Sequence, residues 1–241
     1  MDSLYEHAAF YGLLHDGRTS DLPFYLDATE GRARVLEYGV GRGRVALPMA
    51  RRGQHVLGVD DSAPMLAGLE ERLRQEPPEI RARVRIRCGD ARTLELGERF
   101  DAITCPFNGI THHLELEQLA AFLDHVRLHL APGGVFVFDV AVPNPLLLAG
   151  TTSDVPWFRD PVDGVVCRAT ERIEYDPLRQ VLTVTTEKRP MEGDGEAVEM
   201  VLRMRQLFPE ETLLLLHHHG WSVVERRPEL GDVIGYVCRA R

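Results

Sequence analysis

The sequence is poor in cysteine, and its cysteines have no arrangement typical of a metal centre. The chain of 241 residues contains four of them, at positions 88, 105, 167 and 238, with no CxxC pair and no zinc-like spacing. Three of the four lie within apolar or alternating segments, which favours buried free thiols. We therefore expect no metal site.

Long hydrophobic runs are also missing. No stretch approaches the roughly 20 consecutive apolar residues that a membrane helix needs. The first residues carry acidic and histidine side chains rather than the basic and then apolar layout of a signal peptide. We expect a cytoplasmic protein with no membrane partner.

The chain has no excess of positive charge, since its formal net charge is −9. Proteins that grip nucleic acid normally carry a basic face, because phosphate contacts dominate the affinity. The arginines of RARVRIR (81–87) alternate along a predicted strand and would cover one face without forming a groove. We expect no nucleic-acid partner.

Strand and helix patterns alternate through the first two thirds of the chain, which is typical of βαβ units around a parallel sheet. Predicted strands are ARVLEYG, HVLGVD, RVRIRCGD, FDAITCPF and VFVFDV, separated by the helical segments RVALPMARRG, APMLAGLEERLRQ and LEQLAAFLDHVRLHLAPGG. Three alternating segments then follow, VVCRATERIEYD, VLTVTTEKR and AVEMVLRMRQ, with hairpin turns at DPLRQ and MEGDGE. They predict a small antiparallel β insert after the fifth strand.

This pattern divides the chain into four parts. Residues 1–30 form an N-terminal helical cap, and residues 31–145 form a Rossmann-like core of the α/β class with helices on both faces of its sheet. Residues 155–206 form the insert, which is either a lid or a dimer surface. Residues 207–241 supply a closing helix and the last two strands of the core.

A glycine loop between the first strand and its helix suggests a ligand site. The glycines at 39, 41 and 43 follow Glu37, and glycine lets a backbone turn tightly and approach a ligand closely. Arg44 takes the third-glycine position of a nicotinamide-type GxGxxG, which disfavours an oxidoreductase. A glycine loop alone is a weak signal, because many tight βα turns contain glycine.

Acidic residues after the next two strands strengthen that signal. Asp60 ends the second strand about 20 residues after the loop, where an acid binds ribose hydroxyls in such folds. Asp61 follows directly, and Met65 could pack its thioether on a purine ring. Asp90 ends the third strand. All of these positions lie at the carboxyl ends of strands, where open α/β sheets bind ligands.

With these segments, the chain resembles the class I S-adenosylmethionine-dependent methyltransferases, in particular bacterial enzymes of the methyltransferase domain 25 type that act on small molecules. The resemblance rests on VLEYGVGRGRVALPMARRG, VLGVDDSAPML, IRCGDARTLEL, FDAITCPFNGITHH and LAPGGVFVFDV. It implies a seven-stranded, mostly parallel sheet with an antiparallel last strand. It also implies methyl transfer from S-adenosylmethionine to an O, N or C nucleophile of a small metabolite.

The resemblance also implies a set of cofactor-binding residues. Glu37 would support the amino group of the cofactor, Asp60 would bind the ribose, and Asp90 with the Ala91 backbone would read the adenine edge. The full set is Tyr11, Glu37, Gly39, Gly41, Arg44, Asp60, Asp61, Met65, Asp90, Ala91, Cys105 and Pro106. Arg42 departs from the family, which usually has a small residue there, so the direction of its side chain stays open.

The segment PFNGITHH after the fourth strand is expected to face the methyl group. It lacks the Asn/Asp-Pro-Pro-aromatic pattern of enzymes that methylate amino groups of DNA and protein. His112 and His113 are candidate general bases, since the ordinary histidine pKa is about 6.5, and Asn108 is a third candidate catalytic residue. A structural role for His113, packed at a helix start, is an equally good interpretation.

Other assignments are less specific. Arg168, Tyr175 and Arg205 of the insert are candidate substrate-binding residues, and the insert could also join two copies of the chain in a homodimer. The motifs do not select the leaving group, so aminocarboxypropyl transfer or cyclisation with release of methylthioadenosine stays open. A non-catalytic protein that binds the cofactor is the third alternative.

Overall fold

The computed structural model describes residues 2–192, 195–228, 230 and 232–241. Its first half contains β1 (Asp2–Ser3), η1 (Leu4–His7), α1 (Ala8–His15), α2 (Leu22–Ala28), β2 (Arg34–Tyr38), α3 (Ala46–Arg51), β3 (His55–Asp60), α4 (Ala63–Arg74), α5 (Pro78–Arg81), β4 (Val84–Cys88) and β5 (Phe100–Cys105). Its second half contains η2 (Gly109–His112), α6 (Leu116–His129), β6 (Leu130–Ala141), α7 (Pro145–Leu148), β7 (Thr151–Arg159), β8 (Val166–Asp176), β9 (Val181–Pro190), β10 (Val198–Arg205), α8 (Pro209–His218), β11 (Trp221–Arg227) and β12 (Val233–Ala240). None of the helices in these described ranges has the length and hydropathy of a bilayer-spanning helix.

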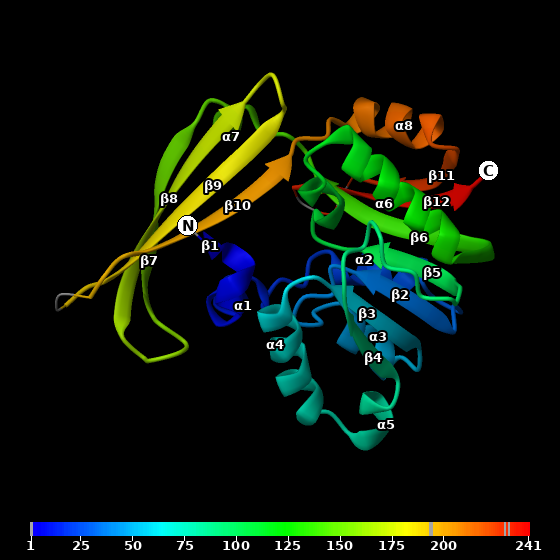
Figure 1. Cartoon of the computed structure of the whole chain (residues 1–241), viewed down its shortest axis with the longest axis horizontal. Helices are drawn as coiled ribbons and strands as arrows, with labels where there is room; N and C mark the ends of the chain where they lie inside the picture. The colour runs from blue at the N-terminus through cyan, green and yellow to red at the C-terminus, as the bar shows by residue number, and fades with distance from the viewer. Residues whose placement is uncertain (1, 193–194, 229, 231) are drawn as a thin grey trace.

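A seven-stranded sheet forms the core, in the order β11-β12-β6-β5-β2-β3-β4. The strands from β4 to β6 pair in parallel, and β12 runs antiparallel to both of its neighbours. Residues of α6 and α8 pack in one apolar cluster, and residues of α2, α3 and α4 pack in a second cluster on the other face. The predicted Rossmann-like sheet with helices on both faces and an antiparallel last strand is confirmed (Figure 1).

A second sheet contains the insert, in the order β1-β10-β9-β8-β7, and is larger than predicted. Its extra strand β7 is almost entirely exposed, contains Pro156 and has an irregular register between Val155 and Phe158. Such an edge strand lacks the alternation that reveals a half-buried strand. The predicted turn at 176–180 is present, since the Asp176 carboxylate accepts the Leu178 and Arg179 amides. In the other predicted turn, residues 193–194 lie outside the described residues.

The first part of the N-terminal cap, with β1, η1 and α1, lies between the two sheets, whereas α2 packs on the central sheet (Figure 1). The cap is helical as predicted except for β1, which pairs in parallel with β10 of the insert. Leu4 and Phe10 pack with Met200 in a small apolar cluster, and α1 also contacts α4 of the core. The cap therefore connects the insert to the carboxyl edge of the central sheet.

Replacement of Gly43 by alanine is predicted to destabilise the fold by about 1–3 kcal/mol. Gly43 has φ of +78°, and an added Cβ would collide with the side chain of buried Leu69. Urea unfolding of Gly43→Ala measures the loss. Gly17→Ala is the matched control, because Gly17 has no positive φ and nothing within 4 Å of the added atom. Equal stability of the two variants would contradict this account of the loop.

Candidate active site

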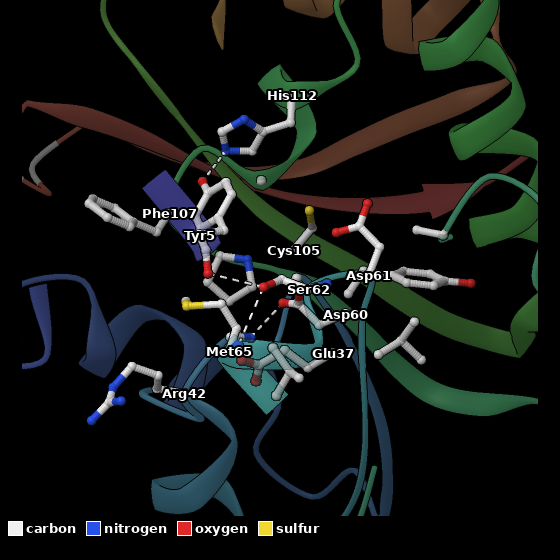
Figure 2. A pocket seen from close by; sticks show the side chains of 18 of the residues that line it. Tyr5, Glu37, Arg42, Asp60, Asp61, Ser62, Met65, Cys105, Phe107 and His112 are labelled. Carbon is white, nitrogen blue, oxygen red and sulfur yellow. Dashed lines mark hydrogen bonds between the residues drawn. The ribbon is translucent and has the colours of Figure 1, made fainter. Parts of the chain in front are cut away.

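A cavity of about 550 Å³ opens at the carboxyl ends of β2, β3, β4 and β5, beneath residues 3–16 of the cap. The structure brings all twelve predicted cofactor residues together around it: Tyr11, Glu37, Gly39, Gly41, Arg44, Asp60, Asp61, Met65, Asp90, Ala91, Cys105 and Pro106. They meet because parallel strands end at the same edge of a sheet. Figure 2 shows several of these side chains converging on the cavity.

The glycine loop is held by Asp60. Gly39 and Gly41 adopt left-handed conformations, with φ of 66° and 51°, which cost glycine little. A Cβ on Gly39 would meet nothing within 4 Å, so this part of the loop leaves open space beside it. The Asp60 carboxylate accepts the Gly41 amide at 2.7 Å and the Ser62 amide at 3.0 Å. Asp60 thus fixes the loop and still has lone pairs for a ligand hydroxyl.

Glu37 is a buried acid without a partner. Its side chain is 1% exposed, and its Oε2 atom has no hydrogen-bond partner among the described residues. Burial raises the pKa of this carboxyl group to about 8, against the opposing effect of Arg44. A buried polar atom left unpaired is costly, so the site is suited to a ligand that brings a cation or a donor to this point.

The arginines of the glycine loop are both paired with acids of the cap. Arg44 donates to the two carboxylate oxygens of fully buried Asp21 at 2.6 and 2.7 Å. Arg42, whose direction the sequence left open, points to α1 and donates to Asp16 at 3.1 Å. These bonds join the loop to the cap. Sequence reasoning missed Asp21, which has no motif to mark it.

The opposite end of the cavity contains Asp90 and His113. Arg92, a lining residue that sequence reasoning missed, binds both oxygens of Asp90 and holds the pKa of that carboxyl below its usual range. His113 lies against the Phe122 ring with centroids 4.5 Å apart. Burial lowers the His113 pKa to about 3, so its ring is neutral. The structure favours the packing interpretation of His113.

Asn108 does not fit its predicted catalytic role. Its side-chain oxygen accepts the Ala141 amide at 2.5 Å, and the residue is not among those described as lining the cavity. Asn108 and Phe107 have φ of 60° and 56°, and both amides donate to the buried carboxylate of Asp139. Tyr25 donates to the same carboxylate at 2.6 Å. Asn108 therefore shapes the loop after β5, and the sequence could not reveal its left-handed backbone.

His112 lines the cavity and has a partner that the sequence did not suggest. The hydroxyl of Tyr5, in the cap, is 2.8 Å from His112 Nε2, and both residues line the cavity. The carbonyl oxygen of Arg203 on β10 is 3.2 Å from His112 Nδ1. The structure therefore keeps His112 as a candidate base and adds Tyr5 to the site.

The three predicted insert residues lie elsewhere. Arg168 is exposed and Tyr175 is half-buried. Arg205 donates to the Leu114 carbonyl at 2.9 Å and to the Gln180 side chain at 3.2 Å, so it connects the insert to the core. In the described structure none of the three lines the cavity, because alternation along a strand does not indicate which face is turned inward.

Comparison with known proteins confirms the predicted family resemblance. Residues 35–134 match a family described as a methyltransferase domain. A dTDP-3-amino-3,6-dideoxy-alpha-D-glucopyranose N,N-dimethyltransferase of Streptomyces fradiae is 28% identical over 141 residues, which are 56% of this chain and 52% of that protein. The chain thus spans about half the length of the curated relatives that it matches.

Solved structures match almost the whole chain. The CcbJ methyltransferase from Streptomyces caelestis is 28% identical with a TM-score of 0.78, over 93% of this chain and 97% of that one. CalS10, an amino pentose methyltransferase from Micromonospora echinaspora solved with S-adenosylmethionine bound, is 24% identical with a TM-score of 0.75, over 100% and 98%. The similarity to CalS10, at 24% identity, supports the fold alone.

Replacement of Glu37 by glutamine is predicted to change how stability depends on pH. The folded-state pKa of about 8 lies above the ordinary value of 4.5, so the folded chain binds more protons than the unfolded chain between these values. The contribution of Glu37 to the free energy of unfolding is therefore fully present below about pH 4.5 and is lost as the pH rises toward 8. Thermal melts of the ligand-free protein from pH 5 to pH 8 should show a larger fall in Tm for the wild type than for Glu37→Gln.

Exposed Glu30 provides the control for this measurement. Glu30→Gln should follow the wild-type pH dependence. Parallel curves for wild type and Glu37→Gln would mean that Glu37 does not carry a raised pKa.

Proposed function

We propose that this chain, whose residues 35–134 belong to the methyltransferase domain family, transfers a methyl group from S-adenosylmethionine to a nucleophile of a small metabolite. The observation that carries the proposal is the buried carboxyl group of Glu37, whose Oε2 has no hydrogen-bond partner among the described residues. It lies beside a left-handed glycine loop and on the strand next to that of Asp60. An amino acid joined to a nucleoside fits these groups, because it brings an ammonium and ribose hydroxyls on one molecule.

The residues fit the cofactor along its length. Glu37 would accept from the ammonium of the methionyl part, and the Asp60 carboxylate would accept from the ribose hydroxyls. At the other end, Asp90 and the Ala91 amide would bind the edge of the adenine. Met65 and the Phe122–His113 pair would pack against its face. When bound, the cofactor supplies a methyl group already activated by the positive sulfonium.

An amine is the acceptor that the site favours. The three cavity arginines, Arg42, Arg44 and Arg92, are each paired with an acid, whereas Glu6 and Asp61 at the cavity have no salt bridge among the described residues. The remaining charge is therefore negative and attracts a cationic substrate. The name of the Streptomyces fradiae relative, which specifies an amino sugar, supports the same class.

We further propose that the cap forms a lid over the cavity, supported by the pairing of β1 with β10 of the insert, and that the insert joins two copies of the chain. Trp157, 69% exposed on edge strand β7, and Val162, 81% exposed beside it, support an interface at this sheet.

We also propose a cytoplasmic location for the protein. It is supported by free thiols at all four cysteines, which persist in a reducing compartment.

Incubation with S-adenosylmethionine and a panel of amines tests the proposal. The panel includes dTDP-3-amino-3,6-dideoxy-α-D-glucopyranose, other amino sugars, and the matched sugars with hydroxyl in place of amine. Mass spectrometry should find S-adenosylhomocysteine and an amine product heavier by one methylene, with no product from the hydroxyl sugars. Release of methylthioadenosine would instead indicate aminocarboxypropyl transfer or cyclisation of the cofactor. Cofactor binding with no product from any amine would contradict the proposed acceptor class.

A further inference from the structure

The side chains of Tyr5 and His112 meet at the wall of the cavity, although they are 107 positions apart in the sequence. Tyr5 belongs to η1 of the cap and His112 to η2 of the core. Their rings make an edge-to-face contact with centroids 5.5 Å apart, and the hydroxyl is 2.8 Å from Nε2. Figure 2 shows the two side chains pointing toward one another, joined by their hydrogen bond.

The insert determines which nitrogen of His112 carries the proton. The partner of Nδ1 is the backbone carbonyl of Arg203, and a carbonyl oxygen can only accept a hydrogen bond. Nδ1 must therefore carry the hydrogen, which leaves a lone pair on Nε2 of the neutral ring. That lone pair accepts the Tyr5 hydroxyl proton. The lone pairs of the Tyr5 oxygen are then available to a donor in the cavity.

We infer that Tyr5 is a catalytic residue that takes the proton of the acceptor amine and passes its own hydroxyl proton to Nε2 of His112. This inference rests on the proposed methyl transfer. The nitrogen–methyl bond forms as the sulfur–methyl bond of S-adenosylmethionine breaks, which leaves neutral S-adenosylhomocysteine. One amine N–H bond breaks and one O–H bond forms on Tyr5, while the original Tyr5 O–H bond breaks and an N–H bond forms on His112.

The surroundings of Tyr5 and His112 keep both side chains neutral at rest and can stabilise a short-lived positive charge on His112. Burial raises the pKa of the Tyr5 hydroxyl well above its ordinary value and lowers that of His112, so both side chains are neutral before the reaction. The imidazolium formed in the step would be stabilised by the Arg203 carbonyl and by the charge of Asp61.

This proton relay, from the amine through Tyr5 to His112, also involves the insert. β10 carries Arg203, whose carbonyl orients His112, and it pairs with β1 directly before Tyr5. The Tyr5 carbonyl accepts the hydroxyl of Ser62 at 3.1 Å, next to Asp60. The proton acceptor is thus assembled from the cap, the core and the insert.

Tyr5→Phe, His112→Asn and the double variant test the relay with the amine that gives product in the panel. Each single variant should lower kcat by about 10²–10⁴-fold, the usual contribution of positioned proton transfer. The affinity for S-adenosylhomocysteine, measured by calorimetry, should stay within about threefold. The double variant should be no slower than the slower single variant, because the two residues act as one unit. Tyr236→Phe and His125→Asn, in the core and on α6, are matched controls that should keep wild-type kcat.

Nitrogen NMR of histidine-labelled protein bound to S-adenosylhomocysteine provides a readout that needs no acceptor. His112 should appear as the neutral tautomer with hydrogen on Nδ1, and its Nε2 resonance should shift in Tyr5→Phe. A tautomer with hydrogen on Nε2, an unchanged Nε2 resonance, or a Tyr5→Phe kcat equal to that of the wild type would overturn the relay. An inactive wild type would instead contradict the proposed function and leave the NMR test standing.

Discussion

The hydrogen bond from the Gly41 amide to the Asp60 carboxylate joins the ends of two neighbouring parallel strands. It fixes the left-handed glycine loop after β2 and places an acid from β3 beside it. The same loop carries Arg42 and Arg44, whose ion pairs with Asp16 and Asp21 hold the cap in place. Loss of this connection would therefore disturb the floor of the cavity and its cover together.

The cap has its own consequences for chemistry. Because Arg42 and Arg44 are bound to acids of the cap, the cavity retains uncompensated negative charge. The buried Glu37 carboxyl gains a raised pKa from the same enclosure. The cap also carries Tyr5 to His112, so the element that covers the cavity also brings the proposed proton-accepting pair together. In the proposed function, the cover of the cavity, charge selection and proton transfer thus depend on one set of contacts.

Much of the fold and the cofactor site could be predicted from the sequence, because the signals are local. Apolar runs such as that of β2 identify buried parallel strands, and residues at their carboxyl ends, such as Glu37, Asp60 and Asp90, must meet at one edge of the sheet. Tyr5, Arg92 and Asp21 were missed, since their roles arise from partners or packing that no local motif marks. Strand β7 was missed because it is an exposed edge. The position of Asn108 outside the cavity lining was not predicted, because its left-handed backbone turns the side chain toward Ala141.

The central claim is that the buried carboxyl of Glu37 receives the ammonium of S-adenosylmethionine. Calorimetry of S-adenosylmethionine binding at pH 7, in buffers of different ionisation enthalpy, tests it most directly. With a pKa of about 8, Glu37 is protonated in the free protein and must lose its proton to pair with the ammonium. Wild type should release about one proton on binding, and Glu37→Gln should release none and bind more weakly. Equal proton release by the two proteins would contradict the account.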